Sequence, residues 1–206
     1  MRGNGVKAVG VLTVAGVMAA GGSALAVSAA GAAPTGAHLR AAPATQKAPA
    51  PDVTVLFGRA LARARATRKP LFAKAVVYEA DGSTANHRPT STASGINTWR
   101  FVFDNTASHS KYASATLAYH AGRFGKVVGI KEPFLEDLRI PKPPKMTLAA
   151  AVKRLRRAGY KSSFKFVTMR RPVGPTTVPT LYLFALSNSR NVSVNTVTGK
   201  VSKLGS

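Results

Sequence analysis

The chain has 206 residues, with 30 lysines and arginines against 7 acidic residues, a formal net charge of +23 and no cysteine. The lack of cysteine excludes disulfides, thiolate zinc sites and cysteine-based catalysis. A positive charge of this size attracts polyanions and speeds association with them, but it does not determine a fold.

The first 32 residues have the composition of a Sec-type signal peptide. Basic residues precede an apolar run at 8–20, and small residues at 24–26 and 30–32 offer cleavage sites. The alternative is an uncleaved anchor, because residues 8–30 approach the length of a bilayer span. Their Ala, Gly, Val and Ser composition favours cleavage. We therefore expect a secreted or extracytoplasmic protein of a bacterial cell envelope, with no stable membrane span once the signal is removed.

A first α+β unit is predicted at 52–131, after a disordered Ala/Pro-rich linker at 33–51. Asp52 caps a helix over 53–67, whose apolar residues recur with helical spacing and whose arginines fall on the opposite side. Strands are predicted at 71–79 (bounded by Asp81-Gly82), 98–104, 113–121 and 126–130.

A second α+β unit is predicted at 146–206, after a connector at 132–145 in which prolines prevent regular structure. Its helix, over 148–158, is capped by Thr147 and ends at Gly159. Its strands are predicted at 164–169, 180–186, 192–196 and 200–204. Because both units share this order of elements and a Gly-Lys-Val segment, we predict a tandem repeat of a helix packed on an antiparallel sheet.

The second unit resembles the PepSY domain family over residues 147–204, and the first unit resembles it only through the internal repeat. The matching segments are TLAAAV at 147–152, GY at 159–160, LYLF at 181–184 and VSVNTVTGKV at 192–201. Asn195 and Thr196 stand where the family prefers Asp-Ala. The resemblance implies a cystatin-like helix on an antiparallel sheet. It also implies a role like that proposed for the family, the inhibition of peptidases.

No catalytic, cofactor or metal site is predicted, and the chain is not expected to be an enzyme. The four histidines, His38, His87, His109 and His120, have no metal-ligand spacing, and no Gly-x-Ser-x-Gly motif occurs. The acidic residues of the connector, Glu132, Glu136 and Asp137, are expected to lie against one of the arginine-rich helices.

The basic helix faces are the candidate binding residues for an anionic partner: Arg59, Arg63, Arg65, Arg68, Lys153, Arg154, Arg156 and Arg157. Ordinary solvated faces remain the alternative. The predicted function is a non-enzymatic module that binds or inhibits a peptidase or another envelope protein. Binding of anionic wall polymers or lipid headgroups is the second possibility, and the location argues against nucleic acid.

Overall fold

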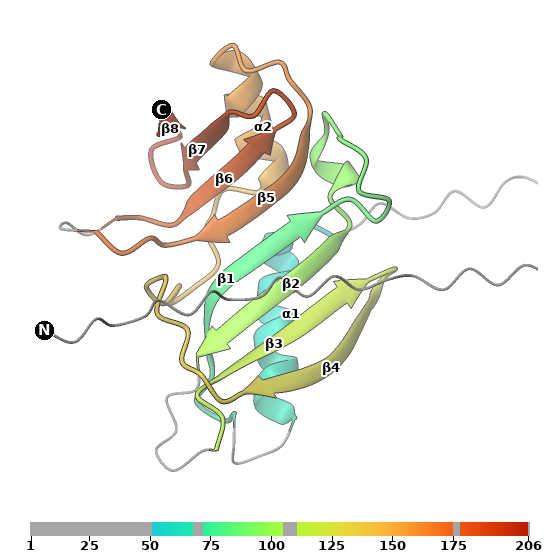
Figure 1. Ribbon diagram of the computed structural model, residues 1–206, viewed down its shortest axis with the longest axis vertical. Helices are drawn as coiled ribbons and strands as arrows, with labels where there is room; N and C mark the ends of the chain where they lie inside the picture. The colour runs from blue at the N-terminus through green and yellow to red at the C-terminus, as the bar shows by residue number, and fades with distance from the viewer. Residues whose placement is uncertain (1–50, 68–71, 105–110, 175–177, 206) are drawn as a thin grey trace, which may run out of the picture. The chain divides into compact units, whose positions relative to one another are not determined.

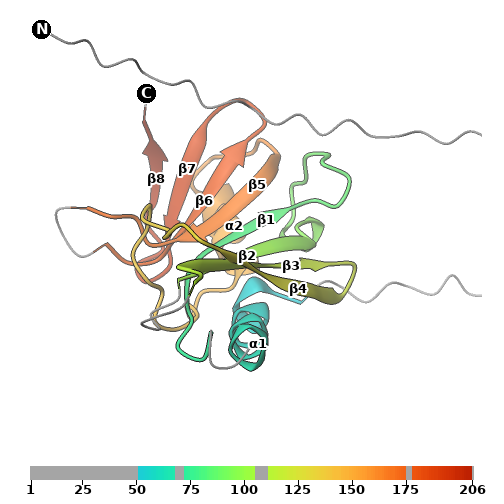
Figure 2. The ribbon, with the colours of Figure 1, turned by 60° about the horizontal axis from the view of Figure 1, so that its bottom comes forward.

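Eight strands form one antiparallel sheet, and two helices lie on the same face of it (Figures 1 and 2). The computed structural model describes residues 51–67, 72–104, 111–174 and 178–205. The predicted signal peptide, and the predicted linker up to residue 50, lie outside these residues. The predicted α+β class and the antiparallel sheet are confirmed.

The sheet has the strand order β4-β3-β2-β1-β5-β6-β7-β8. The elements in chain order are α1 (Val53–Ala66), β1 (Val76–Ser83), the short 3₁₀ helix η1 (Ala93–Gly95), β2 (Thr98–Asp104), β3 (Ser114–His120), β4 (Arg123–Ile130), α2 (Leu148–Arg157), β5 (Phe164–Arg170), β6 (Leu181–Leu186), β7 (Asn191–Asn195) and β8 (Val201–Leu204).

Strands β1 and β5 join the two halves of the sheet. They pair antiparallel from Glu79 opposite Arg170 to Ser83 opposite Phe166. The strands predicted for the first unit and those predicted for the second therefore belong to one continuous sheet. We call the β1–β5 pair, together with the residues packed on it, the seam.

Each helix buries the apolar stripe that its sequence predicts. In α1 the buried residues are Val53, Leu56, Phe57, Ala60 and Ala64, and in α2 they are Leu148, Ala151, Val152 and Leu155. The first helix packs on β1, β2 and β4, and the second on β7 and η1. Burying such a stripe against a sheet is the main source of stability for helices this short.

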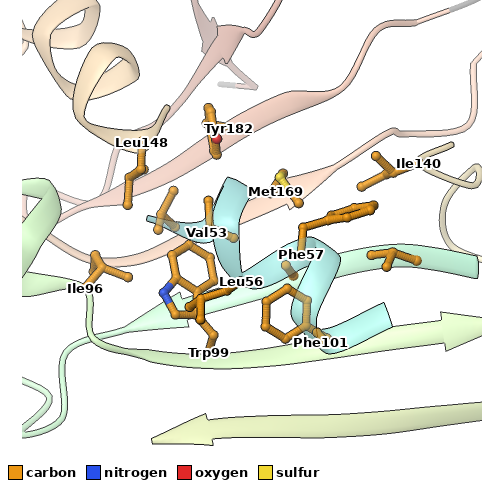
Figure 3. Close-up of a cluster of buried hydrophobic side chains, with 14 of the residues drawn as sticks. Val53, Leu56, Phe57, Ile96, Trp99, Phe101, Ile140, Leu148, Met169 and Tyr182 are labelled. Atoms are coloured by element: carbon orange, nitrogen blue, oxygen red, sulfur yellow. The ribbon is translucent and has the colours of Figure 1, made fainter. Parts of the chain in front are cut away.

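The hydrophobic core is continuous across the seam. Figure 3 shows side chains from both halves of the sheet, from both helices and from the connector packed in one cluster. Ile140 of the connector is 1% exposed, and its backbone N–H donates to the carbonyl of Val77 at 2.8 Å. The connector therefore contributes to the core, although it contains no helix or strand.

The predicted strand boundary at Asp81-Gly82 is wrong, because β1 runs through both residues to Ser83. Gly82 permits a close approach within the strand. A Cβ atom at this position would lie 2.6 Å from Ile96 Cγ2 and 2.7 Å from the ring of Trp99. The glycine is therefore needed for packing, a role that glycine in a strand interior often has.

Candidate functional site

The basic faces of the two helices are largely open to solvent. Side chains of Arg59, Arg63 and Arg65 are exposed on α1, as are Lys153, Arg154 and Arg157 on α2. Arg68 lies outside the described residues. The structure does not bring these residues into one site, since α1 covers the β1–β4 half of the sheet and α2 the β5–β8 half (Figure 1).

Arg156 differs from its neighbours because its guanidinium is used inside the fold. Its Nη1 donates to the carbonyls of Tyr160 and Ser162 at 2.7 and 2.6 Å, and Nη2 donates to that of Ser91 at 3.1 Å. The guanidinium also lies 5.7 Å from the ring centre of Phe164. Arg156 thus ties α2 to two loops, and it is a structural residue of the fold.

Two arginines of α1 also make contacts within the fold, but fewer than Arg156 does. Arg65 Nε donates to the carbonyl of Ala75 at 3.1 Å, and Arg59 lies 5.7 Å from the ring centre of Phe124. Arg63, Lys153, Arg154 and Arg157 are therefore the four candidate residues best suited to test binding without disturbing the fold.

The seam carries an ionic network on the helix-free face of the sheet. Arg100 on β2 donates to Asp81 at 3.0 and 2.5 Å and to Glu79 at 3.4 Å, and Thr168 on β5 donates to Asp81 at 3.0 Å. Arg170 donates to Asp137 of the connector at 2.6 Å. The prediction that the connector's acidic residues lie against a helix is wrong for Asp137, whose partner is a strand residue at the seam.

Two carboxyl groups of this network are buried next to each other. Burial, followed by the nearby charge of Asp81, raises the pKa of Glu79 to about 8. Burial also raises the pKa of Asp137, against the opposing effect of Arg170. Among the described residues, Asp137 Oδ2 has no hydrogen-bond donor while Glu79 is ionised, and a protonated Glu79 supplies one. Burial thus favours the protonated form of both carboxyl groups.

A pocket of about 590 Å³ opens where the connector meets the loop before β6 and the β7–β8 turn. We call it the connector pocket. Four prolines and two valines form its apolar wall: Pro141, Pro143, Pro144, Val178, Pro179 and Val197. Lys142, Lys145 and Arg171 line it as well, and no acidic residue in the described part of the chain does. Its volume lies within the usual range for small-ligand sites, about 300–1,000 Å³.

Neither a metal site nor a membrane-spanning helix is found in the part of the chain that the structure describes. No group of three or more histidine and acidic side chains there could hold a metal ion, and no helix there is long and apolar enough to cross a bilayer. His120 Nδ1 lies 3.0 Å from the hydroxyl of Thr98, His87 is exposed, and His38 and His109 lie outside the described residues.

Sequence reasoning missed both the seam network and the connector pocket. The spacing of Glu79 and Asp81, two residues apart in a strand, could have indicated that they share a face. No local sequence pattern identifies Arg170 as their neighbour, because the β1–β5 pairing joins segments that are distant in the sequence. The same holds for the pocket, where the connector meets Arg171 and Val197.

Comparisons with known proteins give no relative for this chain: no family model, no curated protein and no solved structure matches it.

Proposed function

We propose that the protein is an exported, non-enzymatic binding protein, held on an anionic component of the cell envelope by its exposed positive charge. The observation that supports this proposal is the unequal use of the two kinds of charge. Acidic side chains are few and are largely engaged within the fold, whereas basic side chains face solvent on the helices, the edge strands and the loops.

At least five of the chain's 7 acidic residues have partners among the described residues, Asp104 through a side-chain hydrogen bond with Tyr78. Asp52 accepts hydrogen bonds at the start of both helices, and Glu79, Asp81 and Asp137 belong to the seam network. Because these carboxyl groups are bound within the fold, they offset little of the positive charge of the exposed lysines and arginines. Such a surface attracts wall polymers or lipid headgroups of opposite charge, and the attraction weakens as salt rises.

The finer description of the fold belongs to the same proposal. We propose that the chain is a tandem repeat of PepSY-like units. Each half supplies a helix followed by four strands, and the strand orders of the two halves run outward in mirrored sequence from the β1–β5 pair. This arrangement is what fusion of two copies of one unit through antiparallel edge pairing would produce.

A hollow on the helix-free face favours a second candidate, binding of a protein such as a peptidase. It measures about 380 Å³ and is lined by Phe166, Leu183 and Leu204 among others. Phe166 is 48% exposed, and β8 forms the adjoining edge of the sheet. A partner segment could add to this edge as a further strand while its side chains enter the hollow.

The two candidates are separated by their response to salt. The mature protein is sedimented with purified cell wall, with wall stripped of its anionic polymers, and with anionic or neutral vesicles, at rising salt. We expect binding to the anionic materials only, falling steeply as salt rises. Salt-insensitive capture of an envelope protein, without binding to any anionic material, would favour the second candidate instead.

A further inference from the structure

We propose that the connector pocket binds the phosphate headgroup and adjoining chain of one anionic membrane lipid. This inference rests on the proposed function and deepens it, because it names a lipid as the partner at one particular place. It depends on the wall of the pocket, on the loops around it and on the strand pairing beneath it.

The wall of the pocket suits an amphiphile with negative charge. Proline rings and valine side chains give it an apolar lining, and Lys142, Lys145 and Arg171 supply positive charge. Arg171 is held in place, since its Nε donates to the carbonyl of Val178 at 2.8 Å. A guanidinium held in this way, beside two exposed lysine side chains, can bind a phosphate group from several directions. The apolar wall is then left to contact a hydrocarbon chain.

The loops around the pocket expose apolar side chains at the same end of the sheet. Arg170, the last residue of β5, pairs with the first residue of β6, which pairs with the last residue of β7. The segments that follow β5 and β7 therefore extend from the same end of the sheet. Val173 on one of them is 61% exposed, and Val197 on the other is 77% exposed.

The connector brings a third exposed apolar side chain to this end. Asp137 forms a bridge with Pro172, which places the connector beside the segment that follows β5. Leu135, two residues before Asp137, is 78% exposed. Exposed apolar residues on three loops, with lysines among them, are typical of a surface that contacts a membrane.

The strand pairing disfavours a peptide as the occupant. Strands β6 and β7, whose ends border the pocket, are paired on both sides within the sheet. A peptide in the pocket would therefore find no free strand edge to extend, and it would lack the backbone hydrogen bonds that give strand addition its affinity. A lipid needs no such partner.

The test uses a soluble short-chain phosphatidylglycerol below its micelle concentration, with binding measured by calorimetry. Glycerol phosphate and a short-chain phosphatidylcholine are titrated in parallel. We expect the anionic lipid to bind at one site, and both comparison ligands to bind at least about tenfold more weakly, since each lacks either the chain or the net charge. Equal binding of glycerol phosphate would overturn the apolar part of the proposal.

Two variants assign the site. Lys142→Gln with Lys145→Gln removes two pocket charges, and Lys126→Gln with Lys165→Gln removes two exposed charges elsewhere. The pocket variant should weaken lipid binding about tenfold or more, and the control variant should bind as the wild type does. Val197→Asp should weaken it too. Equal loss in the pocket variant and the control would overturn the site, whereas tight, pocket-dependent binding of an acidic peptide would overturn the lipid.

The results distinguish a failure of the pocket proposal from a failure of the proposed function. If the wild type binds anionic wall or vesicles but not the soluble lipid, the pocket proposal fails and the surface proposal stands. If it binds neither, both fail.

Discussion

The carboxylate of Asp52 accepts a hydrogen bond from the backbone N–H of Leu148 at 2.8 Å, across 96 positions of sequence. The same carboxylate caps α1, through the N–H of Thr54 at 3.0 Å. Both helices therefore start at one side chain, next to the seam. Asp52 accepts hydrogen bonds from N–H groups that helix ends leave without partners. Its negative charge also interacts favourably with the positive end of each helix dipole.

Replacing Asp52 with alanine should destabilise the protein by about 2–3 kcal/mol, because both helix starts lose a charged acceptor. Urea unfolding gives the free energy. Thr147→Ala is the matched control, since Thr147 caps α2 alone, by accepting from the N–H of Ala150. It should cost about 1 kcal/mol. A smaller loss for Asp52→Ala than for Thr147→Ala would contradict a shared role for this carboxylate.

Stability should fall as the pH rises from about 5 to about 8. The folded-state pKa of Glu79, about 8, lies above its ordinary value of 4.5, so between these values the folded protein keeps a proton that the unfolded chain has lost. The proton stabilises the fold at low pH, and its contribution is lost as the pH passes the folded-state pKa. Asp137, whose pKa is also raised by burial, acts in the same direction.

Glu79→Gln tests this assignment, because the amide resembles a protonated carboxyl group and can still donate a hydrogen bond. Urea unfolding from pH 5 to pH 9 should show a flatter dependence for the variant than for the wild type. The groups that face Glu79, namely Asp81, Asp137, Arg100 and Arg170, stay unchanged. Parallel curves for the two proteins would place the titrating group elsewhere.

Arg156 and Arg157 are neighbours in sequence, but their replacement should change the stability of the protein by very different amounts. Replacing Arg156 with glutamine removes donors from three loop carbonyls and should cost about 1–3 kcal/mol. Arg157 is exposed, and Arg157→Gln should change the free energy of unfolding by no more than about 0.5 kcal/mol. Thermal and urea unfolding of the two variants provide the comparison, and equal losses would show that Arg156 is not specially engaged.

Export remains a prediction from the N-terminal sequence. Expressed in a bacterium with a Sec pathway, the protein should be recovered outside the cytoplasm, with its mature N-terminus between Val27 and Pro34. Intact-mass measurement of the recovered protein locates the cleavage. A membrane-bound product that keeps residues 1–26 would instead support the anchor.

Local patterns in the sequence identified the elements but not their assembly. The stripe of α1 and the alternation of Trp99, Phe101 and Phe103 in β2 predicted buried faces, which the structure confirms. The strand predicted at 71–79 starts before β1 and ends before it does, because Gly82 suits a turn as well as close packing. The β1–β5 pairing depends on contacts between distant segments. No period or turn signal encodes such contacts, so the network and the pocket could not be predicted.

The helix faces provide a direct test of binding through exposed positive charge. The variant carries glutamine at Arg63, Lys153, Arg154 and Arg157, and its control exchanges arginine and lysine at the same four positions. Sedimentation with cell wall and anionic vesicles is measured over a salt series. At low salt the glutamine variant should bind at least about tenfold more weakly than wild type, and the difference should shrink as salt rises. The control should bind like wild type. Equal binding by all three proteins would contradict the account, and would leave these helices as ordinary solvated faces.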